Sequence, residues 1–356
     1  MINKLTLYIW KTILVAILLV LTLFIGLEFI FSLVNELRYV GTGDYSTSNA
    51  FAFIFLSMPQ HIAQLFPMAT LVGTLLGLGM LASRSELIVM RASGLSLQDI
   101  INIVLKLAFV LAIGVWLMGE WVSPVAEKFA HDQKALRLSS GQALSTSHGT
   151  WMRDGNNFIH IQAMTEDGHL EGVTLYQFDK DMNLYKASFA LNADYDHDHW
   201  VLHEIQETIF EENKTMRNNI ERLDWVSSLS PNVLSQVSIK DLDDLSLMGL
   251  WHTIKYREQN HLETKPYQLA LWQKIVRPLA TLVMMFLAIP FVFGPLRQAT
   301  MGLRMLVGVL VGFVFYTFNQ LFGPLTLVYH IPPIIGAFLP TIAFLFLGLF
   351  IMKRTH

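Results

Sequence analysis

Cysteine is absent from the sequence and charged residues are scarce. The 356 residues include no cysteine, which excludes disulfides, thiolate nucleophiles and cysteine-ligated metal sites. Charged residues make up 15% of the chain, whereas a typical soluble domain contains about 25%. Hydrophobic residues make up 53%, and the mean hydropathy is +0.44. The shortage of charge together with this hydrophobicity indicates an integral membrane protein.

Three common functional signatures are also missing. With 25 basic and 28 acidic residues the formal net charge is -3, so the chain lacks the basic field that holds nucleic acid. The glycine-rich stretch from Gly73 to Gly79 is followed by no lysine, so it is not a phosphate loop, and we interpret it as a helix-packing surface. No Gly-x-Ser-x-Gly nucleophile elbow occurs. We therefore expect a protein that is not an enzyme, with no catalytic residue and no ATPase motif of its own.

Long apolar runs predict the transmembrane segments. A helix of about 20 residues crosses roughly 30 Å of hydrocarbon. Four runs satisfy this length with few ionisable residues, at 12–34, 50–82, 100–123 and 278–296. Pro59 and Pro67 lead us to expect that the second run first follows the membrane interface and only then forms its helix. The fourth helix is expected to begin slightly earlier, near Trp272.

The last apolar run is too long for one helix. Residues 305–352 contain no Asp, Glu, Lys or Arg, and as one helix they would extend about 70 Å. Phe322-Gly323-Pro324 and Ile331-Pro332-Pro333 supply breaks, so the run predicts a hairpin of a fifth and a sixth span.

The distribution of lysine and arginine predicts the orientation. Six spans place both termini on one side, and short loops on the cytoplasmic side are rich in these residues. The terminal side holds Lys4, Lys11, Arg84, Arg91, Arg297, Arg304, Lys353 and Arg354. The opposite short loops hold only Arg38. Both termini are therefore predicted to be cytoplasmic.

The long polar segment between spans three and four reads as β structure. Stretches such as residues 157–161 and 172–178 alternate apolar and polar side chains, the period of a half-buried strand. Turn-forming residues separate them, which suggests a sandwich, jelly roll or open barrel. A helical connector at 241–259 leads back to the membrane. The predicted domains are residues 1–125 with three spans, 126–265 with the β domain, and 266–356 with three more spans.

Two polar clusters leave alternatives open. The loop 83–94 predicts a short helix whose charges suit docking into a soluble partner, or equally a helix lying in the membrane interface. Asp194, Asp196 and His199, with their neighbours, are metal-type residues, but a tight turn between strands explains them, and we expect no metal. Glu28, Lys274 and Arg277 lie within or near apolar spans, where polar residues are costly and often functional.

Several stretches together resemble the permease family of the lipopolysaccharide export ABC transporter. They are Phe66-Pro67-Met68, residues 77–94 with Arg84-Ser85-Glu86-Leu87, Arg153-Asp154-Gly155-Asn156-Asn157-Phe158, Phe293-Gly294-Pro295-Leu296-Arg297, and residues 322–337. The resemblance covers essentially the whole chain. It implies a multi-pass protein of the Gram-negative inner membrane, with six helices and a periplasmic jellyroll-like domain between helices 3 and 4.

The resemblance also implies a function and a set of partners. Such a permease extracts lipopolysaccharide from the inner membrane and passes it to a periplasmic bridge. The implied partners are the paralogous permease LptF, a dimer of the ATPase LptB, the single-helix regulator LptC, the bridge protein LptA, and lipopolysaccharide as substrate. ATP and magnesium are bound by the ATPase, so no cofactor is implied for this chain.

The resemblance further implies site residues. The loop with Glu86 matches the helix that docks into the ATPase, which assigns coupling to Arg84, Glu86 and Arg91. Family members carry a basic cluster at the outer end of the first helix for lipid A phosphates. Here only Arg38 stands there, with Ser32 and Tyr39 at the other matching positions. Because acyl chains need an aromatic wall, the expected lipopolysaccharide-binding residues are Arg38, Phe66, Lys274, Arg277, Phe313 and Phe318.

Each of these assignments has an alternative. Lys274 and Arg277 could instead extend toward the interface with their charged ends in water. Any one phenylalanine is as easily explained by contact with lipid. For the whole chain the alternative is a non-transporting inner-membrane scaffold whose β domain recruits envelope-assembly factors. A scaffold would not require the docking helix at 83–94.

Overall fold

Two compact units make up the computed structural model, which describes residues 4–138, 150–154, 156–164, 169–179, 183–196, 199–211, 214–225, 227, 242–294 and 299–355. The helical unit contains Met1–Asn35, Ile54–Glu127 and Lys265–His356. The β unit contains Glu36–Phe53 and Lys128–Thr264. We describe each unit by itself.

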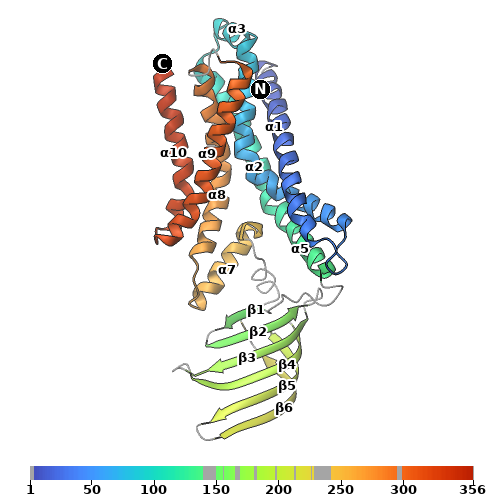
Figure 1. The fold of residues 1–356 in the computed structure, drawn as a ribbon. Coiled ribbons are helices and arrows are strands. Elements are labelled where there is room, and N and C mark those ends of the chain that lie inside the picture. The colour runs from blue at the N-terminus through green and yellow to red at the C-terminus, as the bar shows by residue number, and fades with distance from the viewer. Residues whose placement is uncertain are drawn as a thin grey trace. The chain divides into compact units, whose positions relative to one another are not determined.

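Long helices build the first unit, shown in Figure 1. Six helical segments in the described part of the chain are long and apolar enough to cross a membrane, as predicted. Both chain termini and the short helix α3 lie at one end of this bundle, which we name the terminal end. The helices of this unit are α1 (Lys4–Glu36), α2 (Thr47–Ser83), α3 (Glu86–Ala92), α4 (Leu97–Leu117), α8 (Lys265–Phe293), α9 (Met301–Val328) and α10 (Pro333–Thr355). Helix α5 (Ser123–Leu138) begins in this unit, and its residues from Lys128 onward belong to the β unit.

The third span continues well beyond its predicted end. A π-helical turn, η2 (Met118–Val122), joins α4 to α5, and α5 runs on to Leu138. Residues after Ser123 are too polar for hydrocarbon, so the predicted membrane span stopped at Ser123. The backbone nevertheless stays helical, and the only proline of α5, Pro124, directly follows the π-helical turn, where the regular helix hydrogen-bond pattern is already interrupted.

Three prolines that were predicted to delay or break helices lie inside continuous helices. Pro59 and Pro67 lie inside a continuous α2, so the helix begins at Thr47 and not after these prolines. Pro324 lies inside α9, and the chain turns only between Val328 and Pro333. Each proline removes one helix donor, and packing against neighbouring helices can compensate for that loss. The fourth span, α8, also begins at Lys265, earlier than expected.

The core of the helical unit depends on close helix contacts. A Cβ atom added at Gly73 would lie 2.5 Å from the Cα of Ile17, and one added at Gly77 would lie 2.8 Å from the Cα of Ile13. The two glycines therefore let α1 approach the backbone of α2. This confirms helix packing as the role of the glycine-rich stretch.

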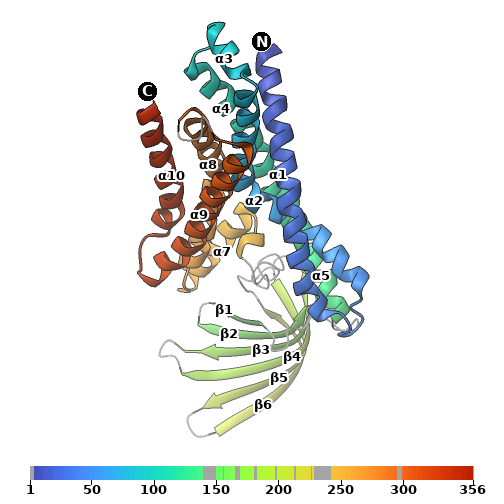
Figure 2. The same ribbon diagram turned by 45° about the horizontal axis from the view of Figure 1, so that its top comes forward.

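The β unit contains one six-stranded antiparallel sheet among the described residues. Its strands are β1 (Thr150–Asp154), β2 (Asn157–Met164), β3 (Leu170–Phe178), β4 (Leu184–Asp196), β5 (His199–Glu211) and β6 (Lys214–Trp225). They pair in the order β1-β2-β3-β4-β5-β6, so each strand contacts its neighbours in the sequence. Figure 2 shows the curvature of this sheet. The predicted β domain between the third and fourth spans is confirmed.

A short helix contributes one residue to the apolar core of the sheet. The 3-10 turn η3 (Leu242–Asp244) and helix α7 (Leu247–Gln259) occupy the predicted connector. Tyr256 of α7 joins the apolar core that Trp200 and Leu202 form on the sheet, and its hydroxyl donates to the carbonyl oxygen of Arg153. Burial, assisted by the nearby charge of Asp154, raises the pKa of Tyr256 to about 12.

Candidate functional site

Helix α3 presents an apolar outer face at the terminal end of the bundle. Its inner residues Leu87 and Met90 are buried in the helical core. Ile88 and Val89, on the other side, are 59% and 67% exposed. Ser85, in the left-handed region with φ of 60°, makes the turn before α3. The helix is therefore anchored to the bundle on one face and offers the other for contact.

The three predicted coupling residues lie together on α3 and its preceding turn. Glu86 is the first residue of α3, where a carboxylate suits the positive end of the helix dipole. The hydroxyl of Tyr8, on α1, donates a hydrogen bond of 2.7 Å to Oε2 of Glu86. Arg84 and Arg91 are exposed. One short segment thus contains the carboxylate of Glu86, hydrogen-bonded to Tyr8, and the two exposed cations Arg84 and Arg91.

Arg304 was predicted to lie in a short loop with the other basic residues of the terminal side, but it does not belong to a solvated loop. It lies in the first turn of α9 and is 2% exposed. Its Nη1 donates a hydrogen bond of 2.6 Å to the carbonyl oxygen of Gly79, in the last turns of α2. A Cβ atom at Gly79 would lie 2.8 Å from this nitrogen, so the glycine makes room for the guanidinium. Arg304 therefore joins α9 to the end of α2 that leads into α3.

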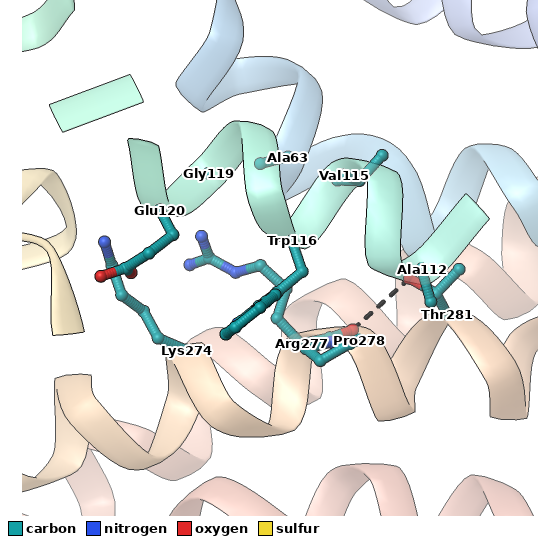
Figure 3. Close-up of a pocket in the computed structure, with 10 residues that line it drawn as sticks. All are labelled: Ala63, Ala112, Val115, Trp116, Gly119, Glu120, Lys274, Arg277, Pro278 and Thr281. Atoms are coloured by element: carbon teal, nitrogen blue, oxygen red, sulfur yellow. Dashed lines mark hydrogen bonds between the residues drawn. The ribbon is translucent and has the colours of Figure 1, made fainter. Parts of the chain in front are cut away.

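Lys274 and Arg277 line an internal pocket of the bundle, shown in Figure 3. The space between its side chains, mouth included, is about 380 Å³. Lys274 is 5% exposed, so its side chain is directed into the bundle and does not extend to the surface. The remaining lining residues are Ala63, Ala112, Val115, Trp116, Gly119, Glu120, Pro278 and Thr281.

The pocket also contains a carboxylate that was not among the residues predicted from the sequence. Glu120 lies on the π-helical turn η2, and Figure 3 shows its carboxylate at the same end of the pocket as Lys274. A π-helical turn changes the direction of the side chains that follow it and is often found at functional sites. The signal in the sequence was a lone carboxylate in an apolar span, which is costly unless it has a polar environment.

Arg38 lies on an exposed segment of the β unit, in the 3-10 turn η1 (Leu37–Tyr39). A buried network fixes this segment. Glu36 accepts hydrogen bonds from the hydroxyl of Tyr45 at 2.6 Å and from Nζ of Lys134 at 2.9 Å. Burial, followed by the bond to Glu36, raises the pKa of Tyr45 above its ordinary value.

Lys134 is the residue of this region that sequence reasoning missed. Its Nζ lies 4.0 Å from the ring centroid of Tyr39 and 4.5 Å from that of Phe53. The lysine is on α5, far in sequence from the end of α1, so no local pattern could associate the two. The structure therefore places a second cation beside Tyr39, although Glu36 compensates its charge.

The predicted aromatic residues separate into two groups. Phe66 is 5% exposed and belongs to the helical core. Phe313 is 59% exposed on α9, and Phe318, also exposed, stacks on Phe322 with ring centroids 5.0 Å apart. Of these predicted residues, only Phe313 and Phe318 are exposed enough to contact a molecule outside this chain.

Two further polar clusters have partners within the chain. Glu28, on α1, accepts from Ser32 at 3.3 Å, and its Oε1 lies 3.3 Å from Nδ1 of His61 on α2. In the sheet, the carboxylate of Asp194 contacts His169 and His203. Asp194 and Asp196 end β4 and His199 begins β5, as a turn between strands requires, while residues 197–198 lie outside the described part.

Comparison with known proteins gives a consistent result over the whole chain. The model of a family described as "Lipopolysaccharide export system permease LptF/LptG" matches residues 7–354. The lipopolysaccharide export system permease protein LptG of Escherichia coli K12 is 40% identical over 350 residues, covering 98% of this chain and 97% of that protein. The LptG protein of Haemophilus influenzae is 38% identical over 356 residues, covering 99% of each.

Proposed function

Because this chain belongs to the LptF/LptG family of lipopolysaccharide export permeases, we propose that it is the membrane subunit of an ABC transporter that extracts lipopolysaccharide from the inner membrane. ATP hydrolysis in a partner ATPase drives this step. The lipid then passes to a periplasmic bridge on its way to the outer membrane. The proposed partners are those of the family: a second permease, the ATPase dimer, the single-helix regulator and the bridge protein.

The observation that carries the proposal is the construction of α3. A short helix between two membrane spans, buried on one face and apolar on the other, fits a groove in a soluble partner. Its charged residues Arg84, Glu86 and Arg91 give that contact orientation and specificity. A scaffold that only recruits factors through its β domain would not need such a helix.

The substrate side of the proposal rests on cations and aromatic rings. Lipopolysaccharide presents phosphates at headgroup depth and acyl chains below them. Arg38 is exposed beside Tyr39 and suits a phosphate, to which an arginine can donate two parallel charge-assisted hydrogen bonds. Exposed Phe313 and Phe318 on α9 suit acyl chains. Lys274 and Arg277 contribute as the cationic lining of the internal pocket, whereas the buried Phe66 would need a rearrangement of the core to meet the lipid.

Removing the carboxylate of Glu86 tests the proposed coupling. If it pairs with a cation of the ATPase in a water-excluded groove, Glu86→Ala will cost about 2 to 5 kcal/mol of docking free energy. We expect less ATPase to copurify with the tagged permease pair, or ATP hydrolysis that no longer releases lipid. Lys353→Ala removes an exposed charge from the same end of the bundle and serves as control. Unchanged assembly and transport in Glu86→Ala would contradict the coupling role.

A further inference from the structure

Tyr8 makes a contact that the proposed function alone does not require. It lies one turn into α1, while Glu86 begins α3, 78 residues later in the chain. Its hydroxyl donates to Oε2 of Glu86 at 2.7 Å, a distance typical of a hydrogen bond to a charged acceptor. The first membrane helix is thereby connected directly to the helix proposed to meet the ATPase.

The backbone and the carboxylate of Glu86 are fixed by different means. Burial of Leu87 and Met90 holds the backbone of α3 against the bundle. The glutamate side chain has several rotatable bonds, and ordering such a side chain costs conformational entropy. The bond from Tyr8 restricts the carboxylate to one direction before the partner arrives. Oε1 and the remaining lone pairs of Oε2 can still accept from a cation.

We infer that Tyr8 is a positioning residue for Glu86, holding the carboxylate in the orientation that receives a lysine or arginine of the ATPase. The inference rests on the proposed function of α3. Docking excludes water from this surface, where Tyr8 is exposed and Glu86 is half-buried in the separate chain, and hydrogen bonds strengthen as water is excluded. The same bond joins α1 to α3.

A double-mutant cycle tests the inference on the intact permease pair in nanodiscs. The affinity for the purified ATPase is measured for the unchanged protein, Tyr8→Phe, Glu86→Ala and the double variant. Tyr8→Phe keeps the ring and removes only the hydroxyl, so we expect a threefold to tenfold loss, about the net value of one hydrogen bond. In the Glu86→Ala background, Tyr8→Phe should cause a much smaller loss, because the carboxylate that accepts its bond is absent and only its interaction with Arg84 remains.

Tyr316→Phe is the matched control. The Tyr316 hydroxyl, in the interior of α9, accepts a hydrogen bond of 3.2 Å from Nε2 of Gln320 and has no contact with α3 in the described structure. This variant should retain full affinity. Thermal unfolding of each variant shows whether the permease pair is intact.

Each other outcome overturns a distinct claim. An equal loss from Tyr8→Phe with and without Glu86 would mean that the hydroxyl acts independently of the carboxylate, and the inference would fail. A strong effect of Glu86→Ala with none from Tyr8→Phe would also remove Tyr8 from the positioning role, while leaving the coupling role of Glu86 intact. No effect from Glu86→Ala would instead refute the proposed coupling itself.

Discussion

Arg38 is the only lysine or arginine in residues 37–46, the segment that joins α1 to α2. A bidentate contact between its guanidinium and a phosphate would be worth about 1.5 to 3 kcal/mol. Lysine offers only a point charge there, and glutamate repels the phosphate. We therefore expect Arg38→Glu to reduce lipopolysaccharide crosslinking to the transporter about tenfold or more, and Arg38→Lys to reduce it less.

The measurement requires that both variants reach normal membrane levels with the ATPase bound. If Arg38 only anchors the helix end in the interface, the two variants will crosslink equally well. The sequence identified Arg38 by its isolation in a short loop. It could not identify Lys134, because that lysine lies beside Tyr39 only once α5 packs against the segment that follows α1.

At the scale of helices, the contact between α1 and α2 depends on glycine. A Cβ atom at Gly73 would lie 2.5 Å from the backbone of Ile17, so Gly73→Ala forces the two helices apart. Overpacking of this kind typically costs about 1 to 3 kcal/mol. We expect a lower midpoint of thermal unfolding for the purified permease pair. Gly26→Ala is the control, because a Cβ atom there meets nothing within 4 Å, and an equal loss in both variants would refute the packing argument.

The six spans could be predicted because hydrocarbon excludes charge, and a run without charge is visible in the sequence itself. Their ends were predicted less well. Helices α2 and α9 pass through Pro67 and Pro324 because neighbouring helices stabilise them, and a local rule about proline contains no information on neighbours. Helix α5 is helical but polar, so hydropathy alone ended the third span near Ser123.

The orientation of the whole molecule is predicted from its lysines and arginines, and the absence of cysteine makes the prediction simple to test. We expect a cysteine at Asn183, exposed in the β unit, to react with an impermeant thiol reagent in intact spheroplasts. A cysteine at Gln98, exposed at the terminal end, should react only after the membrane is opened. The reverse pattern would place α3 in the periplasm and remove every role assigned to it.

Contacts between distant residues limited what the sequence could reveal of the candidate site. Arg84, Glu86 and Arg91 are close in the chain, so their grouping could be predicted. Tyr8 beside Glu86, and Arg304 beside Gly79, arise only when separate helices meet at the terminal end. The sequence showed Arg304 as one more basic residue near a helix end, and only packing shows that it is buried.

The order of strands in the sheet has a consequence for how the β unit is made. Because every strand pairs with the one synthesised just before it, each pairing closes a short loop at little entropic cost. The sheet can therefore grow hairpin by hairpin, from β1 to β6, while the ribosome is still extending the chain and before α8 exists. The bond from Tyr256 to Arg153 spans 103 residues and must wait for α7. Its formation would mark the completion of the domain.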